Sequence, residues 1–112
     1  MPTSITIALD IMSGDNGPSP ALTGAFKSLD LIDDLKIILV GDESLIENKI
    51  DAANKNRVEI VHTDEFIKMD EDLVHAIRNK KKSSMRLAVN CVKDSKAQAC
   101  VSAGNTLSLI HI

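Results

Sequence analysis

The run Lys36-Ile-Ile-Leu-Val40, which stops at Gly41-Asp42, decides the fold class of this 112-residue chain. Its consecutive large apolar side chains leave no polar face, so we expect a strand covered on both sides, as strands of a parallel sheet are. Apolar runs or alternation bounded by turn residues predict further strands at 5–10, 58–61 and 98–101. Strands that alternate with helices form right-handed βαβ units. We therefore predict an α/β fold, a three-layer α/β/α and Rossmann-like arrangement with a mostly parallel sheet, truncated after about four strands.

Apolar residues at helical spacing separate the predicted strands. The first helix is expected to start with Ser19 as its N-cap and Pro20 at its first position, since both residue types favour these places. Apolar residues one turn apart predict helices at 22–29, 46–53, 73–78 and, with Ser83 or Ser84 as the N-cap, at 85–92. Residues 63–72 are expected to form a loop.

Composition excludes several classes of function. Aromatic residues make up 2% of the chain, too few for the stacking platforms that bind single-stranded nucleic acid. No apolar run is long enough to span a bilayer, and no basic residue precedes Lys27, so we expect neither a membrane span nor a secretory signal peptide. The two cysteines, without an export signal, fit a reducing compartment, and the chain is predicted to be cytoplasmic.

No cofactor and no metal are predicted. The chain contains neither G-x-G-x-x-G nor G-x-x-x-x-G-K-[ST], the fingerprints of nucleotide sites. Its histidines and cysteines lack the spacing of metal ligands. We expect His62 to end a strand and His75 to lie on an exposed helix face. Cys91 and Cys100 are expected to pack in the core, because no base that would activate their thiols is evident.

Two loops that follow predicted strands carry the polar residues of a candidate site. The first, 10–17, holds two carboxylates among small residues, and the second is Ser102-Ala-Gly-Asn-Thr106. In open parallel sheets, ligands bind beyond the carboxyl ends of the strands. Gly104 lets the backbone approach a ligand, and hydroxyls with free N–H groups at a helix start suit a phosphate or carboxylate. Ordinary strand-to-helix turns contain the same residue types, so both interpretations stay open.

A basic segment interrupts an otherwise acidic chain of net charge −3. Five of the 13 basic residues and none of the 16 acidic ones lie between Arg78 and Arg86. Such a concentration of positive charge is a candidate site for an anion. The alternative is a solvated helix end without a ligand.

The motifs of the chain, taken in order, resemble those of one family. Ala8-Leu-Asp-Ile-Met-Ser-Gly-Asp-Asn-Gly-Pro18 resembles the signature A-x-D-x-M-G-G-D-x-x-P of the PlsX family, the bacterial phosphate acyltransferases. The likeness continues through Leu39-Val-Gly-Asp42 and Ala76-Ile-Arg-Asn-Lys-Lys-Lys-Ser-Ser-Met85. It closes at Ala97-Gln-Ala-Cys-Val-Ser-Ala-Gly-Asn-Thr106, which is similar to A-[DQ]-A-x-[VI]-S-A-G-N-T-G-A-L. The resemblance covers residues 5–106.

This resemblance implies that inorganic phosphate attacks the thioester carbonyl of a fatty acyl carrier protein, which yields acyl phosphate for phospholipid synthesis. The chemistry needs phosphate held in line and a stabilised oxyanion, and it needs no cofactor. The residues expected to act in catalysis are Asn105, Ser102 and Asp10. Those expected to bind phosphate, shape its site or meet an acidic carrier protein are Gly14, Asp15, Lys81, Lys82, Ser83, Ser84, Arg86, Gly104 and Thr106.

The resemblance also implies partners. These are acyl carrier protein, inorganic phosphate, a second copy in a homodimer, and a glycerol-3-phosphate acyltransferase at the membrane. The complete protein is thus expected in the cytoplasm, peripherally at the inner face of the membrane. Two alternatives stay open: a short-chain phosphate acyltransferase that uses an acyl-coenzyme A thioester, and a non-catalytic anion-binding α/β module complete at 112 residues.

The chain departs from the family pattern in two places. Ser13 stands where the family has glycine. Because serine tolerates a positive φ poorly, we expect an altered loop and a hydroxyl that can contact a ligand. After Thr106 the family continues Gly-Ala-Leu, whereas this chain reads Leu107-Ser-Leu-Ile-His-Ile112, the in-frame translation of a transposon end used in preparing sequencing libraries. We therefore expect 1–106 to be the N-terminal part of one α/β catalytic domain and 107–112 a non-native tail.

This truncation has a consequence for the isolated chain. A parallel sheet that is cut before its next helix leaves apolar surface and a strand edge uncovered. We therefore expect the 112-residue chain alone to be poorly soluble or partly molten, and inactive.

Overall fold

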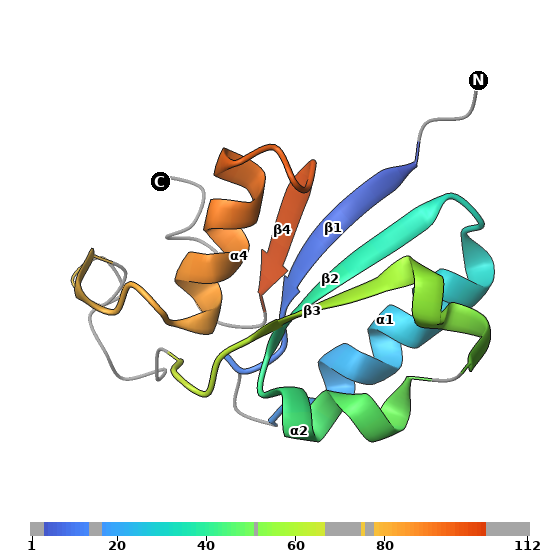
Figure 1. Ribbon diagram of the computed structural model, residues 1–112, viewed down its shortest axis with the longest axis horizontal. Coiled ribbons are helices and arrows are strands. Elements are labelled where there is room, and N and C mark those ends of the chain that lie inside the picture. The colour runs from blue at the N-terminus through green and yellow to red at the C-terminus, as the bar shows by residue number, and fades with distance from the viewer. Residues whose placement is uncertain (1–3, 14–16, 51, 67–74, 76–77, 103–112) are drawn as a thin grey trace.

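The computed structural model describes residues 4–13, 17–50, 52–66, 75 and 78–102 (Figure 1). Its strands are β1 (Ile5–Asp10), β2 (Leu35–Gly41), β3 (Val58–His62) and β4 (Ala99–Ser102). Its helices are α1 (Ser19–Leu31), α2 (Glu43–Ile46) and α4 (Ser84–Lys93), with 3-10 turns η1 (Glu47–Lys49) and η2 (Ala52–Arg57). The strands form one four-stranded sheet in the order β3-β2-β1-β4, and every pairing in it is parallel. This confirms the predicted parallel sheet.

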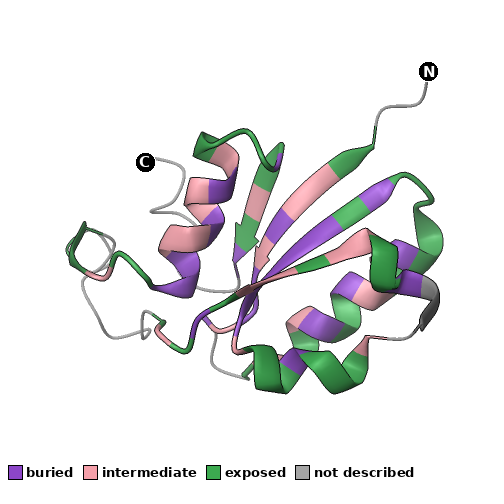
Figure 2. Cartoon of the chain, in the orientation of Figure 1, coloured by how far each residue is buried: buried purple, intermediate pink, exposed green. Residues whose placement is uncertain are grey.

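The β2 strand contributes to both apolar cores of the molecule, because side chains alternate across a strand. Ile37 and Leu39 pack in one cluster with α1. Ile38 and Val40 face the other way and pack in a second cluster with α4. All of them are at most 4% exposed, and Figure 2 shows β2 buried along most of its length. Each such side chain contributes roughly 2 kcal/mol by its burial. Helices therefore cover both faces of the sheet, which confirms the three-layer α/β/α fold.

The start of α1 differs from the prediction. The helix begins at Ser19 itself, after Pro18, and no side chain caps its first N–H groups. The prediction that Ser19 is the N-cap was therefore wrong. Pro20 lies in the first turn as expected, where its missing N–H costs no hydrogen bond. The apolar face of the helix is buried against the sheet as its spacing predicted.

The single helix predicted over 46–53 was also wrong. α2 ends at Ile46, η1 follows, and Ile50 has an extended backbone with φ −84° and ψ 118° before η2 begins. Asparagines such as Asn48 compete for backbone hydrogen bonds and disfavour a continuous helix in this segment. The helix predicted over 73–78 lies mostly outside the described residues.

Arg57, at the end of η2, joins three parts of the fold. Its guanidinium donates to the carbonyl oxygens of Leu29 (2.8 Å), Leu35 (3.2 Å) and Ile32. Leu29 and Ile32 lie at the C-terminal end of α1, where the last carbonyl groups have no partner inside the helix. The positive charge of Arg57 is also attracted by the negative, C-terminal end of the helix dipole. One side chain thus ties the end of α1 and the start of β2 to the segment before β3.

We expect Arg57→Leu to lower the free energy of unfolding by about 3 kcal/mol, because the partly buried carbonyl groups of Leu29 and Leu35 and the exposed one of Ile32 lose this donor. Urea-induced unfolding of the complete protein measures this value. Lys55→Leu is the matched control, since Lys55 lies exposed in the same turn, and it should change stability by less than about 0.5 kcal/mol. Similar decreases in the free energy of unfolding for both variants would show that the hydrogen bonds of Arg57 do not stabilise the fold.

Candidate functional site

The strand order reverses at β1, which lies between β2 and β4 (Figure 1). The chain leaves β1 towards β2 on one side, whereas β4 lies on the other side. In open parallel sheets, ligands bind outside the carboxyl ends of the strands at such a reversal. The last residues of β1 and β4 are Asp10 and Ser102, and they are partners in the strand register. The candidate site is therefore this edge of the sheet.

Asp10 is fully buried and its carboxylate is held by three donors. One oxygen, Oδ2, accepts from the Ser102 hydroxyl at 2.9 Å. The other, Oδ1, accepts from the backbone N–H groups of Met12 (3.0 Å) and Ser13 (3.3 Å). A buried carboxylate is tolerated only with such partners. Asp10 therefore joins β1 to β4 and also fixes the path of the chain as it leaves β1.

The hydrogen bond to Asp10 limits what the Ser102 side chain can do. A hydroxyl carries one proton, and in this structure Ser102 donates it to the Asp10 carboxylate. The same hydroxyl cannot donate to an anion at the same time. Ser102 is therefore suited to holding the end of β4 in place. The donors to a bound phosphate must then be other groups near this edge.

Ser13, which stands where the family has glycine, has no positive φ. Among the described residues other than glycine, Ser95 has the positive φ, at 63°, and Ser13 does not. Whether the loop differs from that of relatives with glycine at this position stays a prediction. The side chain of Ser13 is 1% exposed, and its hydroxyl has no hydrogen-bond partner. A contact between this hydroxyl and a ligand stays a prediction.

The start of α4 is attached to the loop that follows β3. Of Ser83 and Ser84, which were both predicted as possible N-caps, Ser83 is the N-cap. Its hydroxyl accepts from the Arg86 N–H at 3.2 Å. The Ser84 N–H donates to the Glu65 carbonyl oxygen at 2.8 Å. Both serines are 0% exposed, but the Ser84 hydroxyl has no partner. Of the two predicted phosphate ligands, Ser83 thus has a capping role and Ser84 has an uncommitted hydroxyl.

These two neighbouring serines provide a matched pair for stability. We expect Ser83→Ala to lower the free energy of unfolding by about 1 kcal/mol, because the Arg86 N–H loses its cap. Ser84→Ala should leave it unchanged or slightly raised, because a buried hydroxyl without a partner is itself unfavourable. Urea unfolding of both variants checks the difference, and equal losses would contradict these assignments.

Two residues that sequence reasoning missed shape the same edge. A Cβ at Gly41 would lie 2.5 Å from Cγ1 of Ile11, so only glycine lets the chain after β1 cross the end of β2. Thr63, 7% exposed, donates from its hydroxyl to the Lys82 carbonyl oxygen at 2.6 Å. Gly41 could have been found from its place at the end of an apolar strand. Thr63 carries no such signal in the sequence.

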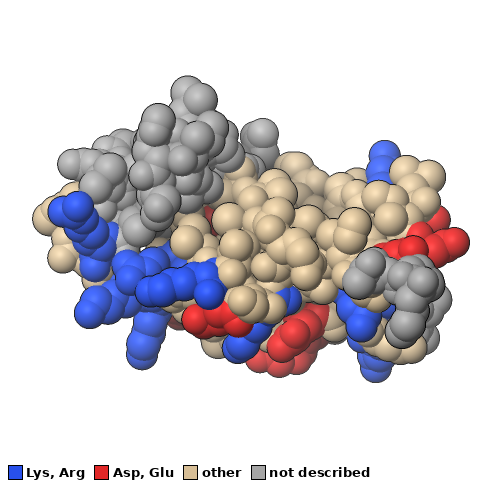
Figure 3. Space-filling view, turned by 90° about the horizontal axis from the view of Figure 1, so that it is seen from above, with Lys and Arg blue, Asp and Glu red and all other residues tan. Residues whose placement is uncertain are grey.

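The basic segment 78–86 lies beside this edge, before and within the first turn of α4. Lys81 and Lys82 are exposed, and Arg86 is half-buried. Figure 3 shows Lys and Arg side chains gathered at one end of the molecule, with few acidic side chains among them on this face. The segment therefore supplies a positive field next to the candidate site. Both predicted interpretations, an anion site and a solvated helix start, remain compatible with this placement.

Both cysteines pack in the core, which confirms their prediction. Cys91 is buried and Cys100 half-buried in the cluster between α4 and the sheet. Burial raises the pKa of the Cys91 thiol above its ordinary value. Burial, and then the Asp10 carboxylate, raises the pKa of the Cys100 thiol. Thiols with raised pKa values stay protonated at neutral pH and are poor nucleophiles.

The histidines also lie where the sequence predicted. His62 ends β3, and its Nδ1 accepts from the Glu43 N–H at 3.0 Å. His75 is exposed and helical. Within the described ranges, no three His, Cys, Asp or Glu side chains form a group that could hold a metal ion. In the same part of the chain, no helix has the length and apolar character needed to cross a membrane.

Several predicted site residues lie outside the described residues. They are Gly14, Asp15, Gly104, Asn105 and Thr106. The structure nevertheless brings together Asp10 and Ser102, the first residues of the two predicted loops. It also places the start of α4 at the carboxyl edge, because Lys82 and Ser84 bond to Thr63 and Glu65, which follow the end of β3. The residues at which the two predicted loops begin, Asp10 and Ser102, therefore meet at this edge.

Comparison with known proteins gives a consistent result. A family model described as fatty acid synthesis protein matches residues 5–111. A phosphate acyltransferase of Shewanella baltica (strain OS155) is 50% identical over 111 residues, which are 96% of this chain and 32% of that protein. The phosphate acyltransferase of Shewanella halifaxensis shows the same identity and coverage, and that of Shewanella woodyi is 46% identical over 113 residues. The chain therefore spans about a third of the length of these curated relatives.

Proposed function

The chain belongs to the PlsX family of fatty acid synthesis proteins, and on this premise we propose that the complete protein is a phosphate acyltransferase. Its substrates are a fatty acyl-[acyl carrier protein] and inorganic phosphate, and its product is an acyl phosphate for phosphatidic acid synthesis. The 112-residue chain spans about a third of the length of its relatives. In this proposal it is inactive by itself.

The observation that carries the proposal is the hydrogen bond between Asp10 and Ser102 at 2.9 Å. Asp10 belongs to the first family motif and Ser102 to the last one, 92 residues apart. Their contact lies at the reversal of strand order, where ligands of open parallel sheets bind. The residues that carry the family resemblance therefore meet at the place where the fold itself favours a ligand.

The proposed reaction is a single acyl transfer. An oxygen of hydrogen phosphate attacks the thioester carbonyl carbon, a C–O bond forms and the C–S bond breaks. The proton of the hydrogen phosphate passes to the leaving thiolate, so that acyl phosphate and the free carrier thiol result. The protein accelerates this step by holding phosphate in line and by stabilising the oxyanion.

The proposed roles follow from where each residue lies. Asp10 and Ser102 position the two loops, because their polar atoms bond to each other. Asn105, with the backbone at Gly104 and the hydroxyl of Thr106, binds phosphate or the oxyanion in this proposal, and Gly14 and Asp15 form the opposite wall. The hydroxyls of Ser13 and Ser84, buried without partners, are further donors.

The basic segment is proposed to meet the acidic carrier protein or to attract phosphate. Lys81 and Lys82 are exposed, so they suit a protein surface, whereas Arg86 is half-buried and closer to the start of α4. We also propose that the complete protein is a cytoplasmic homodimer. It acts peripherally at the inner face of the membrane with a glycerol-3-phosphate acyltransferase.

The donor specificity tests this proposal. The complete protein is incubated with phosphate and either palmitoyl-[acyl carrier protein] or palmitoyl-coenzyme A, and acyl phosphate is trapped with hydroxylamine. We expect phosphate-dependent product with the carrier protein as the better donor. A clear preference for short acyl-coenzyme A would favour the alternative acyltransferase. Binding of phosphate without any transfer would favour a non-catalytic anion-binding module.

A further inference from the structure

Thr63, the first residue after β3, is buried at the carboxyl edge of the sheet and is 7% exposed. Its backbone N–H donates to the Gly41 carbonyl oxygen at 2.9 Å, which fixes Thr63 beside the end of β2. Its hydroxyl donates to the Lys82 carbonyl oxygen at 2.6 Å and accepts from the Glu65 N–H at 3.1 Å. A hydroxyl carries one proton, and this one is given to Lys82. Thr63 therefore links the sheet to the segment that precedes α4.

A second hydrogen bond holds the same segment. The Ser84 N–H donates to the Glu65 carbonyl oxygen at 2.8 Å, and the Glu65 N–H donates in turn to the Thr63 hydroxyl. The two bonds attach the backbone of residues 82–84 at both of its ends. The Thr63 hydroxyl makes one of them directly and orients the residue that makes the other.

The segment attached in this way carries groups that suit phosphate. Lys82 is basic and exposed. The Ser84 side chain is 0% exposed, and its hydroxyl has no hydrogen-bond partner. A buried donor without an acceptor is unfavourable, and a phosphate oxygen is an acceptor that would satisfy it. A folded partner protein is too large to reach a fully covered side chain, so a small anion is the ligand that this hydroxyl favours.

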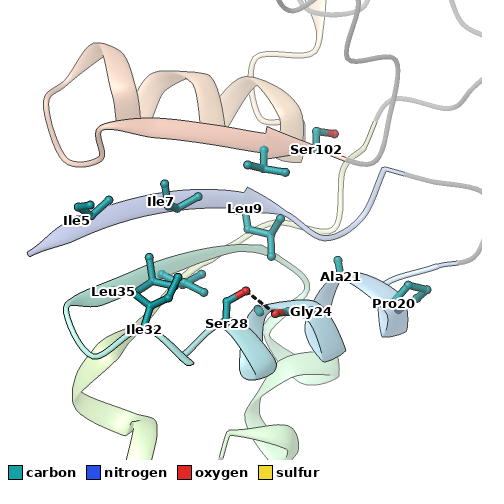
Figure 4. A pocket seen from close by; sticks show the side chains of 13 residues that line it. Ile5, Ile7, Leu9, Pro20, Ala21, Gly24, Ser28, Ile32, Leu35 and Ser102 are labelled. Carbon is teal, nitrogen blue, oxygen red and sulfur yellow. Dashed lines mark hydrogen bonds between the residues drawn. The ribbon is translucent and has the colours of Figure 1, made fainter. Parts of the chain in front are cut away.

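The opposite face of the sheet is less suited to phosphate. The hollow between α1 and β1 is lined by apolar side chains and two serines (Figure 4). The Ser28 hydroxyl donates to the Gly24 carbonyl oxygen at 2.9 Å, and the Ser102 hydroxyl donates to Asp10. An anion without donors is costly to bury. Among the described residues, the start of α4 is therefore the better place for a phosphate.

We propose that Thr63 is a positioning residue for the phosphate substrate. Its hydroxyl holds the backbone of residues 82–84 at the carboxyl edge, so that Lys82 and Ser84 are placed to bind phosphate. This inference rests on the proposed function, which assigns phosphate to the basic segment as one of two roles. It adds the choice of phosphate for that segment and the residue that keeps the segment in place. Thr63 itself does not touch the substrate in this inference.

Thr63→Val tests this role, because valine keeps the shape of the side chain and removes the hydroxyl. In the complete protein we expect the KM for phosphate to rise by about tenfold or more, as small displacements of binding groups do. The KM for the acyl carrier protein thioester should change much less. Thr63→Ser keeps the hydroxyl and should restore most of the affinity for phosphate. Equal effects of both variants, or a rise confined to the KM for the thioester, would overturn the inference.

Arg57→Leu is the control for a loss of stability alone. Arg57 bonds to the Leu35 carbonyl oxygen at the start of β2, at the opposite edge of the sheet. The variant is expected to unfold more easily but to keep the KM for phosphate within about twofold, since distant sites act independently. A similar rise of this KM in Arg57→Leu and Thr63→Val would show that general destabilisation is the cause, and would overturn the inference.

Hydrogen exchange keeps the inference testable if Thr63→Val does not fold. In the unchanged complete protein, saturating inorganic phosphate is expected to slow the exchange of the amides of residues 63–65 and 82–86 together, because their hydrogen bonds join the two segments. The amides of η2 should exchange at the same rate with and without phosphate. Phosphate that protects neither segment, or 82–86 without 63–65, would overturn the inference.

Calorimetry separates this inference from the proposed function. Absence of acyl phosphate from every thioester with the unchanged protein would contradict the proposed function. In that event, a Kd for inorganic phosphate that rises in Thr63→Val and recovers in Thr63→Ser would still support the positioning role. Normal acyl transfer with an unchanged KM for phosphate in Thr63→Val would leave the proposed function intact and refute the inference.

Discussion

Asp10→Ala is expected to lower the free energy of unfolding by about 4 kcal/mol, among the larger losses for a single substitution. The substitution removes a fully buried carboxylate and leaves the N–H groups of Met12 and Ser13 and the Ser102 hydroxyl without their acceptor. Each buried donor left unsatisfied costs roughly 1–3 kcal/mol. Urea unfolding of the complete protein, followed by circular dichroism, measures the loss.

Two further variants show whether burial is the cause. Asp10→Asn keeps an acceptor for the two N–H groups and should lose only about half as much stability. Asp42 caps α2 by accepting from the Ser44 N–H and hydroxyl, but it lies near the surface. Asp42→Ala should cost about 1 kcal/mol, as an N-cap does. Equal losses for Asp10→Ala and Asp42→Ala would show that the link between β1 and β4 contributes little.

Asn105→Ala is expected to reduce phosphate-dependent acyl transfer by roughly 100-fold or more, the usual effect of removing one donor to an oxyanion. The expectation rests on the position of Asn105 in the last family motif, three residues after Ser102. The rate is measured as carrier thiol released per enzyme at saturating phosphate. The free energy of unfolding of the complete protein is expected to change by less than about 0.5 kcal/mol.

Asn56→Ala serves as the control for this variant. Asn56 is exposed in η2, away from the carboxyl edge, and its loss should leave the rate unchanged. A folded Asn105→Ala protein with normal turnover would remove the loop after β4 from the mechanism. The positioning role of Asp10 and Ser102 would then need another explanation.

Much of the fold could be predicted because its signals are local. The apolar run at 36–40 predicted a strand buried on both faces, and Ile37 and Ile38 are indeed buried on opposite sides. Strand ends were predicted to within one residue, because Gly41 and the polar residues after each run mark them. Helix starts were less accurate: a serine or threonine before a helix is only a potential cap, and Ser83 caps whereas Ser19 does not.

The candidate site was predicted in its parts and not in its geometry. The sequence placed Asp10 and Ser102 at the ends of strands, but their hydrogen bond depends on β4 pairing with β1. It assigned anion-binding roles to Ser83 and Ser84 alike, although one hydroxyl is a helix cap and the other has no partner. Such differences arise from contacts between distant segments, which local patterns do not encode.

The sequence by itself determined the class of the fold, the bounds of the strands and the family, because residue types, periodicity and motifs are properties of short segments. Only the tertiary structure decided the strand order β3-β2-β1-β4, the Arg57 bonds that close the end of α1, and the hydrogen bond between Asp10 and Ser102. The physical reason is that strand order follows from which pairings bury the most apolar surface and satisfy the most backbone groups at once. That choice belongs to the whole chain and brings residues 92 positions apart into contact.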